Sequence, residues 1–371
     1  MVSSMPVAST TDVLIVGGGP AGLAAAIAFR KKGIDCVVVE ARSPVIDKAC
    51  GEGLLPSALI SLARLGVEIT ARDGHPFRGI RFTDSTHQVK ADFPQCSGIG
   101  VRRTRLHSRL VEHASEAGAD VRWNSRATLG NQNSALIEGH EVKFRWLVGA
   151  DGQASSVRRW AGLNTFRKES VRYGFRRHYN LSPWDEYVEV YWGSAGQIIV
   201  SPVADDCVCV VYVTRNRHCN WHQVLDEFPQ LQARLQGVAM LSQQRGAVSA
   251  TRKLHTIARG SIALIGDASG SPDIITGEGL AMAFRHACAL ADAIESGNLG
   301  SYSRSHKCIG RLPHAMGALM LTMDRWPSLE AGAMRTLASN PDLFQELLSF
   351  HVGAKCVSEL AVGVSDSSAG F

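Results

Sequence analysis

The sequence predicts an α/β protein in which a Rossmann-type nucleotide-binding domain is interleaved with an antiparallel sheet domain and followed by helices. An apolar strand near the N-terminus runs into a glycine turn, and similar strand-to-glycine motifs recur in the middle and last third of the chain. Between them, segments alternate between polar and apolar residues, as half-buried antiparallel strands do. We therefore expect two domains that are discontinuous in sequence.

Composition narrows the class of protein further. The chain has 371 residues, 45% hydrophobic and 20% charged, which is typical of a globular protein that needs no disulfide or metal for its core. The net charge of +5 comes without a long basic run, so we expect anionic small molecules rather than nucleic acid as partners. The nine cysteines show no C-x-x-C spacing and no signal peptide is recognised, which indicates a reduced, cytoplasmic protein without a metal site.

The first structural unit is predicted over residues 12–40. Residues 12–16 are a buried strand, residues 21–32 a helix closed by Gly33, and residues 36–39 a second strand that ends at Glu40. Glycines and a proline interrupt the apolar stretch 13–29, which favours a strand, a turn and a helix over a transmembrane segment.

The glycine turn of this unit has the residue pattern of a nucleotide-binding site. Gly17 and Gly19 leave room for backbone N–H groups to reach a pyrophosphate at a helix N-terminus, and Gly22 lets that helix pack closely on the strand. The carboxylate of Glu40 is placed to accept both ribose hydroxyls, so the unit predicts dinucleotide binding. Its predicted cofactor-binding residues are Gly17, Gly19, Pro20, Ala21, Gly22, Glu40, Ala41 and Arg42.

The remaining elements follow from periodicity and turn residues. In chain order we expect helices over 59–65 and 105–117, a strand over 144–150, alternating strands over 187–192 and 207–213, a strand over 261–265, and helices from Gly277 to about residue 355. The pair Asp205 and Asp206 reads as a hairpin turn rather than as a catalytic carboxylate pair.

Two further motifs follow predicted strands. The first contains Asp151 after the strand over 144–150, and the second contains Gly266 and Asp267 after the strand over 261–265. An aspartate at such a strand end can accept a hydroxyl hydrogen, and glycines at the next helix start let backbone N–H groups approach a planar ring or a phosphate. The predicted cofactor-binding residues here are Asp151, Gly266, Asp267, Gly277, Glu278, Gly279 and Leu280, with Pro272 shaping the site.

The three ordered motifs resemble the FAD-binding signature of the 4-hydroxybenzoate hydroxylase fold, over roughly residues 12–300. This resemblance implies FAD as cofactor, an FAD contact from Arg103, and NAD(P)H as a transient electron donor without a Rossmann domain of its own. It also implies an FAD-binding domain over 12–70, 97–165 and 252–300, a substrate domain over 71–96 and 166–251, and C-terminal helices over 301–360.

Within this superfamily two branches compete. The segment from Lys48 to Leu54, followed by Pro56, and the Thr276–Gly279 motif are similar to those of geranylgeranyl reductases, although the Tyr-x-Trp-x-Phe-Pro sequence of that family is absent. The segment 188–202 resembles instead the substrate sheet of bacterial FAD monooxygenases.

The resemblance implies an NAD(P)H-dependent monooxygenase that hydroxylates or epoxidises an apolar or aromatic small molecule through a flavin hydroperoxide. The alternatives are a geranylgeranyl reductase-type C=C reductase and a flavoprotein that modifies residues of a partner protein. The candidate catalytic residues are Cys50, Glu52 and Pro272, where Cys50 either acts beside the flavin or only packs.

Two groups of residues keep both a structural and a functional interpretation. His178, Tyr179 and Trp192, on the predicted sheet, are either structural aromatic residues or substrate contacts. The Met-rich run 312–323 is a core or lid face, or else a surface for a carrier or partner protein.

Overall fold

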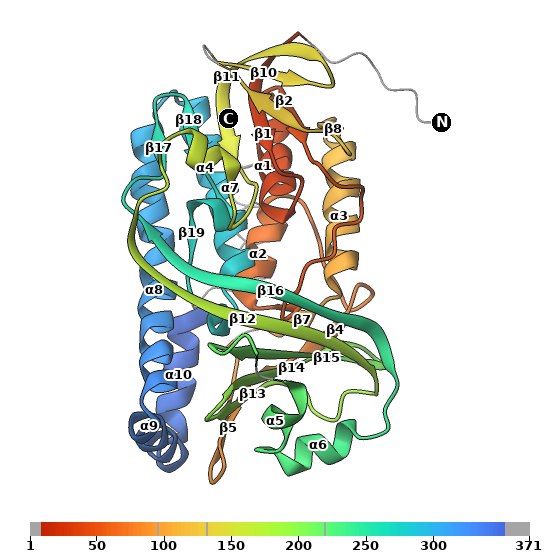
Figure 1. Ribbon diagram of the computed structural model, residues 1–371, viewed down its shortest axis with the longest axis vertical. Coiled ribbons are helices and arrows are strands. Elements are labelled where there is room, and N and C mark those ends of the chain that lie inside the picture. The colour runs from red at the N-terminus through yellow and green to blue at the C-terminus, as the bar shows by residue number, and fades with distance from the viewer. Residues whose placement is uncertain (1–8, 95, 131–132, 219, 353–371) are drawn as a thin grey trace, which may run out of the picture.

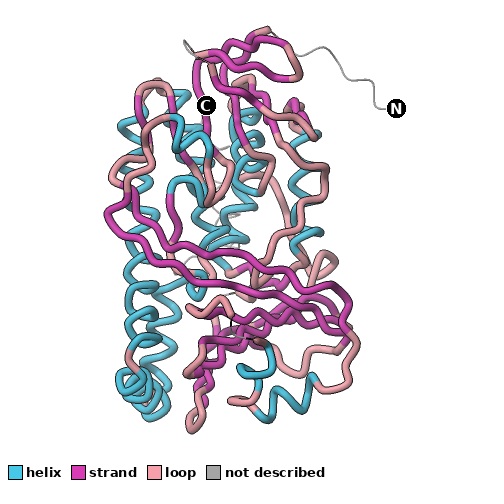
Figure 2. The backbone as a smooth tube through the Cα atoms, in the orientation of Figure 1, coloured by secondary structure: helices cyan, strands magenta, loops and turns pink. Residues whose placement is uncertain are grey.

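The computed structural model describes residues 9–94, 96–130, 133–218 and 220–352. It has an upper α/β body, a lower sheet, and a column of C-terminal helices along one side (Figure 1). Two long strands, β12 (Phe166–Asn180) and β16 (Met240–Leu254), run side by side from the upper body into the lower sheet (Figure 2). The predicted interleaving of an α/β body with an antiparallel sheet and terminal helices is confirmed.

The upper body is built on a parallel sheet with the order β18-β11-β1-β2-β8. Val13, Leu14 and Ile15 are fully buried, because helices cover this sheet and a strand buried on both faces needs a continuous apolar run. The strands are β1 (Thr10–Val16), β2 (Cys36–Val39), β8 (Asp120–Arg122), β11 (His140–Gly149) and β18 (Ile262–Leu264), extended by the antiparallel β9 (Ala127–Leu129), β10 (Ser134–Ile137) and β17 (Ala258–Arg259).

Helices α1 and α7 of the upper body start at the predicted glycine turns. Helix α1 begins at Pro20, whose missing N–H costs nothing in the first turn, and its alanine-rich surface packs on α7. The helices are α1 (Pro20–Lys31), α2 (Pro56–Arg64), α3 (Arg103–Glu116), α4 (Ser156–Trp160) and α7 (Gly279–Glu295).

The lower sheet has the order β19-β16-β12-β15-β14-β13-β5-β6, and every neighbouring pair is antiparallel except β13 and β5. Residues 205–206 form the predicted turn between β14 and β15. The strands not yet given are β5 (Gly79–Thr83), β6 (Gln88–Asp92), β13 (Tyr187–Gly193), β14 (Gly196–Ala204), β15 (Cys207–Thr214) and β19 (Gly270–Ser271), and a separate small sheet contains β3 (Gly53–Leu54), β7 (Gly98–Gly100) and β4 (His75–Phe77).

Each face of the lower sheet is covered. Helices α5 (Trp221–Leu225) and α6 (Pro229–Leu235) share an apolar core with one face. On the other face, α8 (Leu299–Arg325), α9 (Pro327–Ser339) and α10 (Pro341–Val352) contribute to a second core. In the Met-rich run, Met323 is buried in that core and Leu319 is 49% exposed, so only part of the run is a core face.

The helical C-terminus is confirmed as far as Val352, and the predicted end near residue 355 lies outside the described residues. Over the described part of the chain, no helix combines the length and the apolar character that crossing a bilayer requires.

Candidate functional site

The three predicted motifs meet at one edge of the upper sheet. Strands β1, β2, β11 and β18 are parallel, so their carboxyl ends lie together and place Gly17, Glu40, Asp151 and Gly266 side by side along this edge. Ala150 N donates a hydrogen bond of 2.8 Å to Val16 O, which ties the first and second motifs directly. This edge, where open α/β sheets bind nucleotides, is the candidate cofactor site.

The glycine turn after β1 is shaped by close backbone contacts. A Cβ on Gly17, which has φ of 112°, would lie 2.5 Å from Ala150 O, and one on Gly22 would lie 1.8 Å from Gly17 O. A Cβ on Gly19 would meet nothing within 4 Å, so this residue faces open space at the start of α1. Gly19 provides no side-chain cap, and the first N–H groups of α1 are therefore available to an anion.

Glu40 and a histidine hold the two sides of this turn. The Glu40 carboxylate accepts hydrogen bonds from Gly18 N at 2.8 Å and from Arg42 N at 3.0 Å. His107 Nε2 lies 2.9 Å from Gly18 O, and burial above all lowers the pKa of this histidine, which keeps its ring neutral. The sequence analysis missed His107, although its position four residues after Arg103 puts the two on one face of α3.

Arg103 brings a buried positive charge to the site. It is the first residue of α3 and is only 9% exposed. Its backbone N donates to Glu52 Oε1 at 2.9 Å, whereas its side-chain Nε has no hydrogen-bond partner among the described residues. A buried guanidinium nitrogen without a partner fits an anionic group that completes the site.

The aspartates of the second and third motifs have different surroundings. Asp151 Oδ2 accepts from the N and Oγ of Ser156, at 2.6 and 2.8 Å, so this oxygen caps the start of α4. Its Oδ1 is buried and has no partner among the described residues. Asp267 Oδ2 lies 3.1 Å from Lys48 Nζ, a partly exposed ion pair that the sequence analysis did not predict.

The start of α7 gives a second open helix N-terminus. Gly279 is its first residue, and a Cβ there would meet nothing within 4 Å. Gly277 has φ of 67°, a conformation that favours glycine. The Glu278 carboxyl is buried and accepts from Ser57 Oγ at 2.8 Å, and burial raises its pKa.

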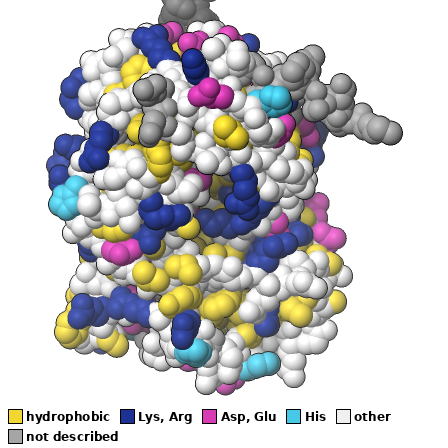
Figure 3. All heavy atoms as spheres, turned by 45° about the horizontal axis from the view of Figure 1, so that its top comes forward, with side chains coloured by type: hydrophobic (Ala, Val, Ile, Leu, Met, Phe, Trp, Pro, Cys, Tyr) yellow, Lys and Arg dark blue, Asp and Glu magenta, His cyan; other side chains and the backbone are white. Residues whose placement is uncertain are grey.

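Together these groups fit FAD in chemistry. Two uncapped helix N-termini and Arg103 suit the phosphates, the Glu40 carboxylate suits a ribose, and Asp267 can accept a ribitol hydroxyl. Lys and Arg side chains also gather across the middle of the face shown in Figure 3, where they favour an anionic cofactor.

A second cluster joins the upper body to the lower sheet, and we call Asp47, Glu52, Arg176 and His178 the junction cluster. The Glu52 carboxylate accepts from Arg176 Nη1 at 3.1 Å and from His178 Nε2 at 2.7 Å, in addition to Arg103 N. Glu52 is 3% exposed and has φ of 59°, unusual for a residue other than glycine. The residue is thus held in a strained conformation by partners from both parts of the molecule.

Asp47 completes the charge balance of the junction cluster. It accepts from Arg176 at 2.7 and 2.9 Å and pairs with Arg245 at 2.7 Å. Burial disfavours the Asp47 carboxylate, but Arg176 and Arg245 hold its pKa below the ordinary value. The two acids of the cluster thus face two arginines, the buried Arg176, which is 1% exposed, and Arg245.

Cys50 lies next to this cluster. Its Sγ accepts from Glu52 N at 3.4 Å, and Cys209 Sγ of β15 donates to Cys50 O at 3.7 Å. Side-chain atoms of Glu52, His178 and Cys209 lie within 4.8 Å of one another, a grouping that could hold a metal ion. The Arg176 guanidinium, however, already supplies a positive charge to the Glu52 carboxylate, so this grouping is complete without an ion.

The three aromatic candidates of the sheet separate in the structure. His178 belongs to the junction cluster, whereas Tyr179 is buried in the core under α5 and α6. Trp192 packs edge-to-face on Phe82 at 5.7 Å between ring centroids, in the core of the opposite face. Tyr179 and Trp192 therefore pack in the two apolar cores on opposite faces of the sheet.

Pro272 is buried beside a second ion pair between the two parts of the molecule. Its neighbour Asp273 pairs with Arg172 of β12 at 3.0 Å, and both side chains are 1% exposed. This pair fixes the loop that precedes α7 against the long strand β12.

The fold and this site define a flavoprotein of the 4-hydroxybenzoate hydroxylase and geranylgeranyl reductase superfamily. The family model described as "FAD binding domain" matches residues 10–300, and the chain belongs to this family. The expected FAD-binding fold is thereby confirmed.

Similar proteins include two groups of reductases. A menaquinone reductase of Mycobacterium tuberculosis (strain ATCC 25618 / H37Rv) is 32% identical over 195 residues, which cover 48% of each chain, so the match spans about half the length of that relative. A digeranylgeranylglycerophospholipid reductase of Methanosarcina acetivorans is 27% identical over 296 residues, covering 72% of this chain and 71% of the relative.

Solved structures show the same fold. A flavoprotein/dehydrogenase of Cytophaga hutchinsonii aligns with a TM-score of 0.81 and 19% identity over 92% of this chain and 93% of the other. A geranylgeranyl bacteriochlorophyll reductase-like protein of Thermoplasma acidophilum aligns with a TM-score of 0.70 and 25% identity, over 93% and 92% of the two chains.

Proposed function

We propose that the protein is an FAD-dependent reductase of an isolated C=C bond in an apolar molecule, with NAD(P)H as a transient electron donor. The observation that carries this proposal is the loop from Cys50 to Gly53, which resembles that of geranylgeranyl reductases and is fixed between the cofactor edge and the sheet. Relatives that reduce a menaquinone and a digeranylgeranylglycerophospholipid support the same class.

Residue roles in the proposed reaction follow from these positions. When bound and reduced by NAD(P)H, FAD would supply the hydride for one carbon of the double bond. The Cys50 thiol is the proposed proton source for the other carbon, and Glu52 is a positioning residue because its carboxylate already accepts from three donors. Pro272, on the loop before α7, shapes the flavin edge.

The proposal is tested with a Cys50→Ala variant. We expect an unchanged FAD content and an unchanged rate of flavin reduction by NAD(P)H, but a C=C reduction rate lowered by about 10²-fold or more, since positioned proton transfer contributes about that much. Cys36→Ala, which changes a cysteine in a buried strand of the upper sheet, is the matched control. Equal turnover of the Cys50→Ala and Cys36→Ala proteins would remove Cys50 from the mechanism.

A monooxygenase acting on an apolar or aromatic molecule is the second candidate. The absence of the Tyr-x-Trp-x-Phe-Pro sequence favours it, because Gln197, Ile199 and Ser201 precede Pro202 in the strand β14. Productive turnover would then consume oxygen in a one-to-one ratio with substrate. Product formation at full rate without oxygen would exclude this candidate.

A flavoprotein that modifies residues of a partner protein is the third possibility within the same class. No feature of the described surface favours it over a small-molecule substrate.

A further inference from the structure

A cavity of about 290 Å³ lies between the long strands β12 and β16 and helix α8. Its lining includes Lys168 of β12, Lys253 of β16, and Arg311 and His314 of α8, together with Thr251, Ala315, Ala318 and Leu321. The volume corresponds to about ten water molecules at ~30 Å³ each, which is room for a pyrophosphate-sized group. Among the residues that the structure describes, no acidic side chain lines the cavity.

Three of the cations that line this cavity are exposed to solvent: Lys168, Lys253 and Arg311. Lys168 and Lys253 are register partners on neighbouring antiparallel strands, and like charges placed directly opposite destabilise a sheet. Within the described residues, neither lysine nor Arg311 forms an ion pair. Glu169, the acid next to Lys168 in sequence, forms an ion pair with Arg252 instead, with Arg252 Nε 2.7 Å from Glu169 Oε1.

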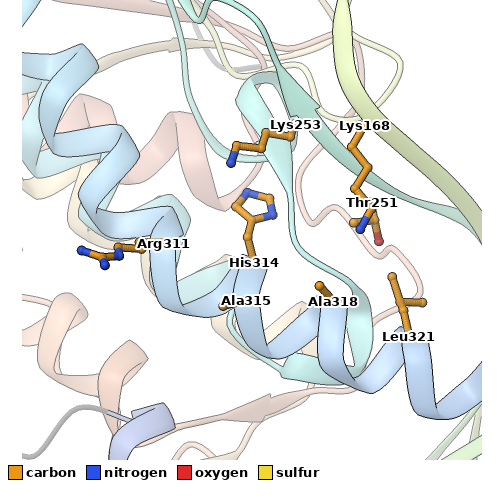
Figure 4. A pocket seen from close by; sticks show the side chains of 8 residues that line it. All are labelled: Lys168, Thr251, Lys253, Arg311, His314, Ala315, Ala318 and Leu321. Atoms are coloured by element: carbon orange, nitrogen blue, oxygen red, sulfur yellow. The ribbon is translucent and has the colours of Figure 1, made fainter.

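The lining side chains do not all point the same way. In Figure 4, Lys253 and His314 turn toward each other and Lys168 extends toward Thr251, whereas Arg311 points away from the other labelled side chains. Burial, followed by the charges of Lys253 and Lys168, lowers the pKa of His314. An anion seated here would relieve the repulsion among these groups.

The base of the cavity is connected to the flavin loop. Thr251 Oγ1 donates to Asp273 Oδ2 at 3.1 Å, and Asp273 follows Pro272 in the loop before α7. Gly317 of α8 packs on the same loop, because a Cβ there would lie 3.3 Å from Asp273 N. A ligand in the cavity would therefore lie one hydrogen bond away from the loop that shapes the flavin edge.

We propose that Lys168, Lys253, Arg311 and His314 form a binding site for a phosphate-bearing ligand, separate from the FAD site. Phosphate oxygens carry the charge and accept the hydrogen bonds that ammonium and guanidinium groups donate. Two sources provide this chemistry: the nucleotide phosphates of an NADPH-type electron donor, and the diphosphate of a prenyl substrate. The test of this site measures binding and not turnover. A negative result would therefore reject the site without bearing on the proposed C=C reduction.

The experiment measures binding of inorganic pyrophosphate to the FAD-loaded protein by calorimetry, and follows the flavin absorbance in parallel. We expect saturable binding with a change in the flavin spectrum, weakened at least about tenfold in a Lys168→Gln/Lys253→Gln variant, because each lost charged hydrogen bond costs about that much. The control variant Lys90→Gln/Lys143→Gln removes the same net charge from exposed positions on β6 and β11 and should bind as the unmodified protein does.

Two further probes identify the source of the phosphate. Adenosine 2′,5′-bisphosphate binding more tightly than pyrophosphate would assign the site to the electron donor, and geranylgeranyl diphosphate binding more tightly would assign it to the substrate. FAD content and thermal midpoint verify that the lysine variant is folded. Absence of saturable binding by all three probes, or binding unchanged in the folded lysine variant, would overturn the proposal.

Discussion

The cofactor edge and the junction cluster are built from different kinds of residue. At the cofactor edge, Gly17, Gly19 and Gly22 act through the absence of side chains, and backbone groups form most of the site. In the junction cluster, by contrast, long charged side chains from distant segments meet, as in the contact between Glu52 and Arg176.

The difference lies in what each region tolerates. A close backbone contact, such as the position of Gly22 against Gly17 O, excludes any side chain. A buried ion pair tolerates neither a missing nor an additional charge, because its cost of desolvation is offset only by a complete set of partners. We therefore expect added side chains to disrupt the cofactor edge, and altered charges to disrupt the junction cluster.

The largest effect is expected at the cofactor edge. Gly17→Val and Gly22→Ala each place a Cβ within 2.5 Å of a backbone oxygen, at 2.5 Å from Ala150 O and 1.8 Å from Gly17 O respectively. The glycine turn then cannot close around the pyrophosphate, and we expect colourless protein without FAD, measured by absorbance after purification.

The control for this prediction is Gly332→Ala. Gly332 lies in α9, where a Cβ meets nothing within 4 Å, so this variant should keep its FAD. A yellow Gly17→Val protein with normal FAD content would contradict the assignment of the turn.

The next effect is expected in the junction cluster. Glu52→Gln keeps the size of the side chain but leaves Arg176 and His178 without the carboxylate they share. Removing one partner of a buried ion pair costs about 3–5 kcal/mol, which denaturant unfolding should detect. Glu116→Gln, at a side chain 72% exposed in an ion pair with His113, should change stability by less than ~1 kcal/mol. Equal losses of unfolding free energy in the two variants would show that the buried charge of Glu52 does not stabilise the protein.

A smaller and pH-dependent effect is expected from buried histidines beside α8. Burial lowers the pKa of His306 from 6.5 to about 4, and it lowers the pKa of His286, which stacks on His306 at 4.2 Å. Between the pKa of His306 in the unfolded chain, 6.5, and its pKa of about 4 in the folded protein, the unfolded chain binds more protons than the folded one. The contribution of His306 to stability is therefore complete above pH ~6.5 and declines toward pH ~4. The loss from His306 is about 3 kcal/mol at most.

This decline is measured as the thermal midpoint at neutral pH and at about one unit below the ordinary histidine pKa. His306→Gln should reduce the difference between the two midpoints, whereas His140→Gln, at an exposed position, should leave it unchanged. An unaltered difference in His306→Gln would assign the acid sensitivity to other groups.

The sequence was informative where function depends on local pattern. The strand before Gly17, the glycine spacing and the acid at Glu40 lie within one short segment, so the unit over 12–40 could be predicted with nearly its observed bounds. Glu52 could be singled out as a candidate, but its partners could not, because Arg176 lies 124 residues away in sequence.

Other features had little signal in the sequence. The strand β16 has many exposed residues on both faces and thus lacks the clear alternation that marks a half-buried strand. His107 carries no motif, and its contact with Gly18 depends on how α3 packs against the glycine turn. Lys48 begins the cysteine-glycine motif, but its contact with Asp267 lies 219 residues away in sequence.

The proposed reduction of a C=C bond is tested most directly by an anaerobic reoxidation experiment. The FAD-loaded protein is reduced with NAD(P)H without oxygen and then mixed with menaquinone or a geranylgeranyl lipid. We predict that the absorbance of oxidised flavin returns and that the product gains two hydrogens. Flavin that stays reduced with every unsaturated acceptor, but reoxidises in oxygenated buffer with an oxygenated product, would contradict the reductase and establish the monooxygenase.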